Sequence, residues 1–543
     1  MFRKTSLQSS IFDIEKLVPG VLPEDDWSFI YKKQILPLID EEQFRHLYDA
    51  HIGRPNYSIR TMVSLLIFMG QETLGWREAE FQFARRIDWM IATNTPVDKA
   101  LIDHSTLFDF YKRISDDEVV SRLFFRLRDE FMHICGTSAV KQRTDSFFIH
   151  GWLELLSRYG LFKETIRKFL QSLRKHNNYL YSEIKDELSK NYLDKSFDLT
   201  EKDKQLAHKR IALMAQDLLR IIKAFENNDQ IKHYETFKVL QKIFTQQCDV
   251  QERDNDNPEI IIKKKPDSDT VCSPHNTDVR YVRKGKQRVT GNKGFISETC
   301  SKKNEVQFVT DVEVTDTTES DSEQLREIQD RLKESDCTPE KQYGDAGFTN
   351  GKTIIESSNN GIDLEGPSAG RSQSFEAYKS DERPLDAGDF DISFRESDEI
   401  HINKCPERQI PLAQKRSEKT GKINVHFDAD VCRNCKNRKR CPVKIGVKIA
   451  TFNVDEVNYV GAVRHHKYME DSGYRKECAT RAGVEGTVSE FTRAHGMRKS
   501  RHRNKEGTKL QMFFAAIGCN IKRFIRYTQN CGKLTPAFRK YSA

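Results

Sequence analysis

A short cysteine-rich stretch late in the chain has the residue types and spacing of a metal site. Cys432 and Cys435 are separated by two residues in the sequence VCRNCKNRKRC, which ends with Cys441. A C-x2-C turn directs two thiolates toward one tetrahedral ion, and Cys405 in NKCPER is the natural fourth ligand. Because thiolates select Zn²⁺ over Mg²⁺, we expect a structural zinc site here.

Two other interpretations of this stretch stay open. His401 or His426 could replace Cys405 as the fourth ligand, or the cysteines could lie among basic residues without binding any metal. The basic side chains between the cysteines are also available for contacts with DNA: Arg433, Lys436, Arg438, Lys439 and Arg440.

Two aspartates lie where a β-sheet could present them to a bound cation. Asp145 lies in RTDSFFI, inside a strand predicted over 140–149, where an acid among apolar neighbours is costly to bury unless it is bound or paired. Asp345 ends a predicted strand in QYGDAGF, where Gly344 and Gly347 permit a sharp turn. Because Mg²⁺ takes only one or two protein oxygens, acids from several elements can converge on it. The alternatives are a surface-facing strand residue and an ordinary turn aspartate.

A glutamate late in the chain is the third candidate acid. Glu485 lies in RAGVEGTVSEF, and a helical interpretation of this segment places Arg481 four residues earlier, at the spacing of an exposed ion pair. Glu490 is the competing acid, but it lies five positions further on and points to a different side of such a helix. We therefore favour Glu485.

The segment FTRAHGMRKSRHR, residues 491–503, is locally basic. It contains no acid, and its cationic residues are Arg493, Arg498, Lys499, Arg501 and Arg503. Such a patch can contact phosphates, although it can equally be a solvated face. The net charge of +8 fits a polyanion partner without requiring one.

Helical and strand patterns alternate around these residues. Helical spacing over 23–132 fits either a helix-turn-helix DNA reader or a simple packing domain. The strand at 140–149 is followed by helices up to 248, a polar linker at 251–269, and then a strand, strand, helix, strand pattern that ends at YGDAGF. The helical block therefore indicates an insertion. Residues 367–399 are typical of an irregular connection, and helical patterning dominates from 454 onward.

The composition limits the protein class. A chain of 543 residues exceeds one core and suggests three or four structural units. Charged residues make up 31%, and no segment has the roughly 18 apolar residues that a membrane span needs. The N-terminus carries early charges and no apolar run of a secretory signal. We therefore expect a cytoplasmic protein without a membrane partner, in which the cysteines are free or metal-bound.

The chain resembles the DDE transposases of bacterial insertion sequences, which have a ribonuclease-H-like catalytic core. The motifs that carry the resemblance stand in order over nearly the whole chain: GRPNYSIRTMVSLLIFMG, DHSTLFDFYKRI, RTDS, YGDAGF, VEGTVSEFTRAHGMRKSRHR and AAIGCNIKRF. In that family the first aspartate lies on the first strand, the second follows the fourth strand, and the glutamate lies on a later helix. The resemblance assigns these positions to Asp145, Asp345 and Glu485.

The resemblance also implies a chemistry. The triad would hold Mg²⁺ or Mn²⁺, water would cleave the transposon end, and the freed 3′-hydroxyl would attack target DNA. Arg481 would join the basic residues of 491–503 in binding double-stranded DNA, and a homodimer or higher synaptic assembly would handle two ends together. Two alternatives stay open: a non-catalytic DNA-binding protein derived from a transposase, and a ribonuclease-H-like nuclease without strand transfer.

The predicted fold is α/β, a ribonuclease-H-like mixed-sheet core with a helical N-terminal domain, a helical insertion and a small zinc-binding insertion. The predicted division is 1–136 for the helical DNA-binding domain, 137–151 and 266–366 for the first part of the core, 152–265 for the helical insertion and linker, 367–447 for an irregular segment with a zinc knuckle, and 448–543 for the C-terminal helical part of the core with the basic patch.

Overall fold

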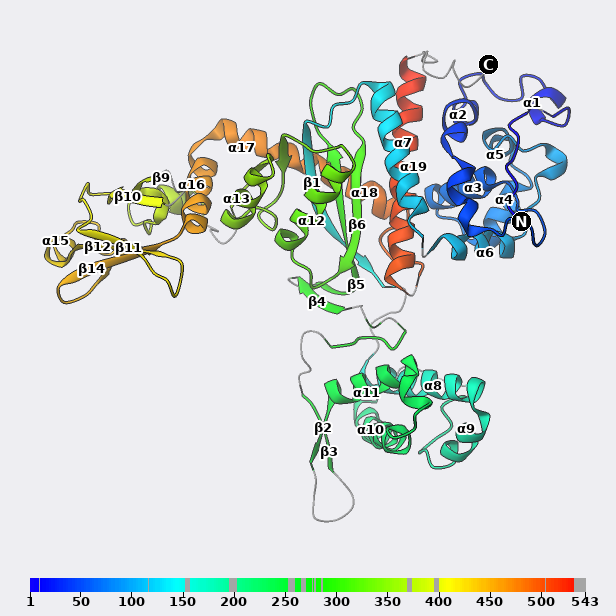
Figure 1. The fold of residues 1–543 in the computed structure, drawn as a ribbon, viewed down its shortest axis with the longest axis horizontal. Helices are drawn as coiled ribbons and strands as arrows, with labels where there is room; N and C mark the ends of the chain where they lie inside the picture. The colour runs from blue at the N-terminus through cyan, green and yellow to red at the C-terminus, as the bar shows by residue number, and fades with distance from the viewer. Residues whose placement is uncertain are drawn as a thin grey trace.

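The computed structural model describes residues 1–531 apart from 9, 116, 152–156, 195–202, 252–258, 265–269, 276, 278–279, 285–286, 369–373, 395–399 and 503. Arg503 and the predicted domain boundaries at residues 152 and 265 therefore fall outside the described residues. A sheet with covering helices lies at the centre, and the N-terminal helices, a helical unit and a small β unit surround it (Figure 1).

The N-terminal part is helical, as its spacing predicts. Its helices are α1 (Ile14–Leu17), α2 (Trp27–Ile30), α3 (Ile59–Glu72), α4 (Trp76–Phe83), α5 (Ile87–Ala92), α6 (His104–Ser115) and α7 (Val119–Cys135). Helix α3 begins where the Ser58 hydroxyl accepts a hydrogen bond from the Thr61 amide, and it ends at Thr73, whose φ is 56°. Its residues 59–69 are all buried, because the long helix α19 (Lys505–Cys531) packs against it.

Helix α19 joins the N-terminal helices to the sheet. It contacts α3, α7 and β6 (Val309–Asp316). Phe524 stacks on Phe131 of α7 with ring centroids 4.3 Å apart. A Cβ at Gly518 would lie 2.8 Å from the Gln71 side chain, so this glycine permits the close approach of α19 to α3. The apolar side chains of α19 recur at helical spacing and are buried: Leu510, Phe513, Phe514, Ile517 and Ile521.

The central sheet is mixed. Strand β1 (Lys141–His150) pairs antiparallel with β5 (Gln287–Thr299), which pairs antiparallel with β4 (Arg280–Lys284) and β6. On its other edge β1 pairs parallel with β7 (Lys341–Tyr343), which pairs parallel with β8 (Asp363–Glu365). Helix α12 (Asp321–Glu334) connects β6 to β7, and α13 (Gly351–Asn359) connects β7 to β8. The predicted strand, strand, helix, strand order is therefore confirmed.

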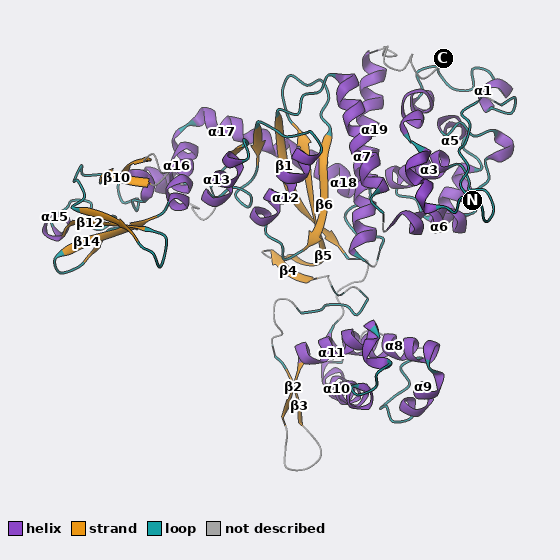
Figure 2. Ribbon diagram, in the orientation of Figure 1, coloured by secondary structure: helices purple, strands orange, loops and turns teal. Residues whose placement is uncertain are grey.

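Both faces of the sheet are covered by helices (Figure 2). Phe295 of β5 packs with α12 and α13 in one apolar cluster, whereas its neighbour Ile296 packs in the cluster that includes α7 and α19. Consecutive strand residues point to opposite faces, so one strand contributes to two cores. The sheet is consequently covered on both faces.

The segment between β1 and β5 contains a helical unit with its own apolar core. Its helices are α8 (Arg158–His176), α9 (Asn178–Lys185), α10 (Lys204–Phe225) and α11 (Glu235–Gln247). The stretch predicted as a polar linker instead contains β3 (Glu259–Ile262), which pairs antiparallel with β2 (Cys248–Gln251). The reason is the short β-branched run EIII, which favours a strand over a turn.

The cysteine-rich segment is a small β unit rather than an irregular connection. Its elements are α14 (Phe375–Lys379), β9 (Asp391–Phe394), β10 (Ile400–Lys404), β11 (Ala413–Arg416), β12 (Ile423–Asp428), α15 (Ala429–Arg433), β13 (Lys444–Ile445) and β14 (Ile449–Val454). Strand β14 pairs with β12 and β13, so this unit continues past residue 447, where the predicted segment ends. Alternate residues of β12 and β14 fill its core, as Val425 and Phe452 illustrate.

Three helices lead from this unit back to the sheet: α16 (Glu456–Glu470), α17 (Ser472–Cys478) and α18 (Val484–Arg493). Helix α16 packs closely on α13, because a Cβ at Gly351 would lie 1.9 Å from the Val457 carbonyl oxygen. Helix α18 contacts β1 and α19. Among the described residues, no helix is both long and apolar enough to cross a membrane.

Candidate active site

The two predicted aspartates lie at the same edge of the sheet. Strands β1 and β7 are parallel, and Arg143 pairs with Tyr343. The same register continued by two residues brings Asp145 level with Asp345, which follows the end of β7. The Asp345 carboxylate accepts a hydrogen bond of 2.7 Å from the Gly347 amide, so the turn fixes its orientation.

A third aspartate, Asp321, lies beside them. It is the first residue of α12, and its carboxylate forms an ion pair of 2.8 Å with Lys293 of β5. A Cβ at Gly347 would lie 2.6 Å from Asp321 Oδ2 and 3.0 Å from Asp345 Oδ1. Both carboxylates therefore face this glycine. Asp321 was not predicted from the sequence, because an acid in the first turn of a helix after a capping serine is an ordinary helix start.

Arg481 connects the first and the last acid of the predicted triad. Its guanidinium lies 3.0 Å from Asp145 Oδ2 through one nitrogen and 3.1 Å from Glu485 Oε1 through another. The predicted pair between Arg481 and Glu485 is thus present. The Glu485 side chain is 64% exposed, whereas that of Asp145 is 14% exposed. Asp145 of β1 and Glu485 of α18 consequently share the Arg481 guanidinium.

Burial and charge together act on Asp145. Burial raises the pKa of Asp145 to about 6; the Ser146 amide and Arg481 lower it, and the negative charges of Asp345 and Asp321 raise it. Four carboxylates in this cluster face two cations, Lys293 and Arg481. The donors are carboxylate oxygens with excess negative charge, which is the chemistry that suits Mg²⁺ or Mn²⁺.

Glu490 belongs to a different contact network. Its carboxylate lies 3.0 Å from Lys522 Nζ and 3.5 Å from an Arg523 guanidinium nitrogen, both on α19. Burial raises the pKa of Glu490, but the neighbouring His495, Lys522 and Arg523 lower it more strongly and hold it well below its usual range. Glu490 therefore faces α19, whereas Glu485 faces Asp145.

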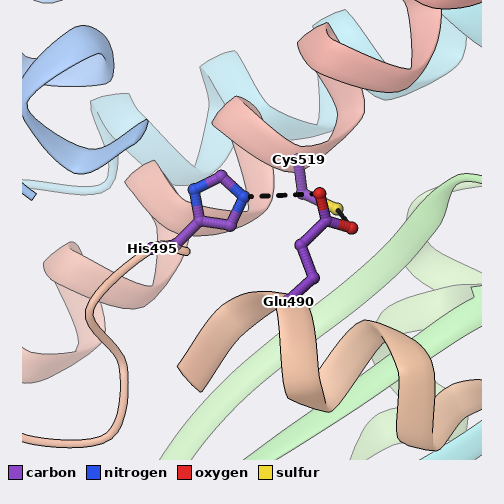
Figure 3. Close-up of side chains that lie close together, drawn as sticks. All are labelled: Glu490, His495 and Cys519. Atoms are coloured by element: carbon purple, nitrogen blue, oxygen red, sulfur yellow. Dashed lines mark hydrogen bonds and ion pairs between the residues drawn. The ribbon is translucent and has the colours of Figure 1, made fainter. Parts of the chain in front are cut away.

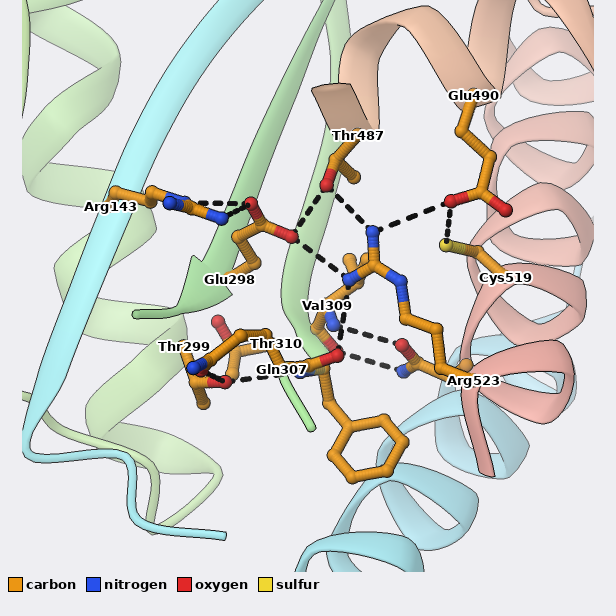
Figure 4. A network of polar contacts seen from close by, with 12 residues as sticks. Arg143, Glu298, Thr299, Gln307, Val309, Thr310, Thr487, Glu490, Cys519 and Arg523 are labelled. Atoms are coloured by element: carbon orange, nitrogen blue, oxygen red, sulfur yellow. Dashed lines mark hydrogen bonds and ion pairs between the residues drawn. The ribbon is translucent and has the colours of Figure 1, made fainter. Parts of the chain in front are cut away.

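A buried glutamate ties α18 to the sheet (Figure 4). Glu298 of β5 accepts hydrogen bonds from Arg143 Nε at 2.7 Å, from Thr487 Oγ1 at 2.6 Å and from Arg523 at 2.9 Å. These three partners lie on β1, α18 and α19. The same network that holds the helices together thereby sets the position of Glu485 relative to Asp145.

Comparison with known proteins gives two matches to family models. A model described as "Transposase domain (DUF772)" matches residues 26–113, and a model described as "Transposase DDE domain" matches residues 404–525. The two matches support an insertion-sequence DDE transposase. No curated protein and no solved structure matches it. The first match covers the transposase from α2 to most of α6, and the second includes Glu485 but neither Asp145 nor Asp345.

The DDE domain implies a ribonuclease-H-like core, a DNA substrate and, in general, divalent-metal catalysis of phosphodiester chemistry. The sheet of the transposase agrees with this: three antiparallel strands, β1, β5 and β6, are followed by two strands parallel to β1. Asp145 lies on the first of these strands, and Asp345 follows the fourth, β7.

The basic segment of the transposase runs beside the end of β1. The His150 amide donates to the Arg498 carbonyl at 3.0 Å, and the Ser500 amide donates to the His150 carbonyl at 2.7 Å. Arg493, Arg498 and Lys499 are exposed. His150 is five residues from Asp145, a distance of about 17 Å along a strand. The basic segment thus meets the C-terminal end of the strand that carries Asp145.

Arg501 differs from its neighbours. Its guanidinium donates a 2.7 Å hydrogen bond to the Leu74 carbonyl in the N-terminal helices. Burial lowers the pKa of Arg501. The Arg501 guanidinium therefore helps to hold the basic segment against the N-terminal helices, and fewer of its hydrogen-bond donors are available to a phosphate. Arg503 lies outside the described residues.

The four cysteines of the transposase line one cavity, together with Phe427 and Val443. The Gln409 amide donates to Cys405 Sγ at 3.4 Å, and Arg408 in the same turn has φ 61°. Burial raises the pKa of Cys432, and the other three thiols raise it further. The donor set is all sulfur, which suits zinc.

The two alternative histidines do not line this cavity. His426 Nδ1 lies 3.4 Å from Thr451 Oγ1, and His401 Nε2 lies 3.4 Å from Gln414. Cys405 is therefore better placed than either histidine as the fourth ligand. Among the described residues, three other groups of possible ligands already have their ligand atoms within 4.8 Å of one another: Glu490, His495 and Cys519; Glu80, Asp103 and His104; Asp386, Asp389 and His466. The four cysteines and the triad are not among these groups, so their side chains would have to move closer together to bind an ion.

Proposed function

We propose that this transposase binds the terminal repeats of its own element and catalyses metal-dependent cleavage and transfer of DNA strands. The observation that carries the proposal is the convergence of Asp145, Asp345 and Glu485 from three elements, with Arg481 between the first and the last. Ribonuclease-H-like topology and the two transposase matches support the same chemistry.

The triad would hold Mg²⁺ or Mn²⁺, with Asp321 beside it. Such an ion, when bound, activates water or a 3′-hydroxyl and stabilises negative charge on the phosphate. Asp145 is mostly ionised at pH 7, because burial raises its pKa only to about 6, and a bound ion would offset the cost of its buried charge. Arg481, which pairs with two of the acids, would then be free to contact a phosphate oxygen.

Double-stranded DNA would lie over the sheet edge and the basic segment. Arg493, Arg498 and Lys499 are exposed and would contact the phosphate backbone, and Arg501 would contribute less. We further propose a homodimer or a higher synaptic assembly, because two transposon ends and a target must be handled together.

The cysteine-lined cavity would hold a structural Zn²⁺ through Cys405, Cys432, Cys435 and Cys441. The ion would tie the turns at 405–409 and 432–441 together in a unit whose apolar core is small. Metal analysis of Cys432→Ser checks this proposal: the variant is expected to lose about one zinc per chain.

One experiment separates the candidate functions. The purified chain is incubated with Mg²⁺ or Mn²⁺ and a duplex that carries the inverted repeats flanking its reading frame, and binding, nicking and joining are measured together. The proposal expects all three. Binding without nicking would indicate a non-catalytic DNA-binding protein, and nicking without joining would indicate a nuclease.

A further inference from the structure

A third cluster of possible metal ligands shares no residue with the two sites described above (Figure 3). It consists of Glu490 near the end of α18, His495 in the turn that follows, and Cys519 in α19. His495 Nε2 lies 3.8 Å from Glu490 Oε1, and Cys519 Sγ lies 3.4 Å from Glu490 Oε2. One ligand atom from each residue lies within 4.8 Å of the other two.

His495 is the unusual member of this cluster. Its side chain is 1% exposed, neither ring nitrogen makes a hydrogen bond, and Nε2 has a long contact of 3.8 Å with the Glu490 carboxylate. A buried polar group without a partner is costly and calls for an explanation such as an ion. The Phe491 ring packs edge-on against the imidazole with centroids 6.1 Å apart, which holds the ring in place. Figure 3 shows the imidazole directed at the Glu490 carboxylate.

We propose that Glu490, His495 and Cys519 bind a zinc ion, with a fourth position left for water. A tetrahedral zinc with a Zn–N bond of about 2.0 Å and a Zn–S bond of about 2.3 Å separates its ligand atoms by roughly 3.3–3.7 Å. The two distances in the cluster run to different oxygens of one carboxylate: 3.8 Å from His495 Nε2 to Glu490 Oε1, and 3.4 Å from Cys519 Sγ to Glu490 Oε2. One ligand atom from each residue lies within 4.8 Å of the others, so the ligand atoms would have to approach one another by up to roughly 1.5 Å to close around the ion.

The three ligands can match the charge of one Zn²⁺. A neutral His495, a Glu490 carboxylate and a Cys519 thiolate supply two negative charges, which match one Zn²⁺. Burial raises the pKa of Cys519, so the thiol proton would leave to solvent only as the metal binds. Soft and borderline ligands of this kind select zinc over Mg²⁺, which distinguishes this site from the carboxylate cluster.

Two cations compete with zinc for Glu490. Lys522 lies 3.0 Å from its carboxylate, but the lysine side chain is 45% exposed and can turn into solvent. Arg523 keeps its closer partner, Glu298, at 2.9 Å. The metal would thus replace one exposed ion pair and leave the buried network intact.

A bound ion would restrain the position of α18. The ion would join α18, the turn after it and α19 at one point. Glu485 lies five residues before Glu490 on the same helix, about one and a half turns away. The zinc would therefore limit the movement of the helix that carries the proposed catalytic glutamate.

The test is metal analysis of the full chain purified without chelator. Cys432→Ser combined with Cys435→Ser removes the other proposed zinc, and about one zinc per chain is expected to remain. Adding His495→Ala or Cys519→Ala to this background should abolish it, whereas Cys300→Ala, which removes a buried thiol elsewhere, should not. Co²⁺ in place of zinc should give a thiolate charge-transfer band that Cys519→Ala removes.

Replacing Lys522, the cation that competes for Glu490, distinguishes a zinc site from a simple ion pair. Lys522→Met should tighten zinc binding by up to about fivefold, the equivalent of one exposed ion pair. If Glu490 serves only as an ion-pair partner, Lys522→Met will lower the unfolding temperature, and in the Cys432→Ser, Cys435→Ser background it will leave the zinc content at zero. If His495→Ala fails to fold, His495→Gln tests the same ligand. Absence of zinc from the Cys432→Ser, Cys435→Ser protein, or its retention in the histidine and Cys519 variants, would overturn the proposal. DNA cleavage plays no part in this test, so its outcome is independent of the proposed function.

Discussion

Replacing Asp145 with asparagine is expected to stabilise the metal-free protein while it abolishes activity. The folded-state pKa of Asp145 is about 6, against an ordinary value of 3.8. Because the unfolded chain ionises this group more easily, the ionised carboxylate costs folding free energy that grows as the pH rises from about 4 to 6 and is then constant. A shift of about two pKa units corresponds to about 3 kcal/mol at pH 7. An asparagine at this position carries no charge and avoids this cost.

The assay is thermal unfolding of wild type and Asp145→Asn in chelator, across a pH series. At pH 7 the transition of the unit that contains the sheet should rise by roughly 6–12 °C in the variant, since about 1 kcal/mol shifts a unit of 150–250 residues by 2–4 °C. The difference should vanish below pH 4, where both forms are neutral. Mg²⁺ or Mn²⁺ should stabilise wild type and not the variant.

The control is Asp330→Asn, which removes an exposed carboxylate from α12 and should leave the unfolding temperature unchanged at every pH. A metal-free Asp145→Asn protein that is less stable than wild type at pH 7 would refute the reasoning. So would a difference that persists below pH 4, because it could not come from ionisation of this carboxyl.

Three further predictions concern the surroundings of the acids. Glu298→Gln should lower the free energy of unfolding by about 3–5 kcal/mol in a urea titration, because it removes the carboxylate partner of the largely buried Arg143 and the closer carboxylate partner of Arg523. Equal destabilisation by the exposed variant Glu327→Gln would contradict this. Gly347→Ala should abolish metal-dependent nicking and leave DNA binding unchanged in a gel-shift assay, since the added Cβ clashes with two carboxylates; full nicking would contradict it. Arg498→Ala with Lys499→Ala should reduce the slope of log affinity against log salt by about 0.9 for each phosphate that is no longer neutralised, and an unchanged slope would exclude these side chains from DNA binding.

Local patterns predicted most of the secondary structure. Helical spacing predicted α3 and α19, and the strand pattern around Asp145 predicted β1 within one residue of its ends. These signals are local, since amphipathic periodicity and turn glycines depend on neighbouring residues. The choice of Glu485 over Glu490 also followed from helix geometry, and the two side chains do face different partners.

Long-range contacts could not be predicted in the same way. Asp321 has the pattern of an ordinary helix start, and its place beside Asp345 depends on how α12 packs on the sheet. The Glu298 network joins residues more than 150 positions apart. The β unit around the cysteines was missed although INVHFD and IATFNV alternate apolar and polar residues, because the cysteine motif alone suggested a knuckle.

The central claim is that Asp145, Asp345 and Glu485 act together in DNA cleavage and joining. The most direct measurement is the rate of nicking and joining of the element's own ends by Asp145→Asn, Asp345→Asn and Glu485→Gln, with Asp330→Asn as the matched control. We predict that each of the three variants binds the DNA as wild type does and yields neither nicked nor joined product in Mg²⁺ or Mn²⁺, while the control retains full activity. Retained cleavage in any one of the three variants would contradict the account.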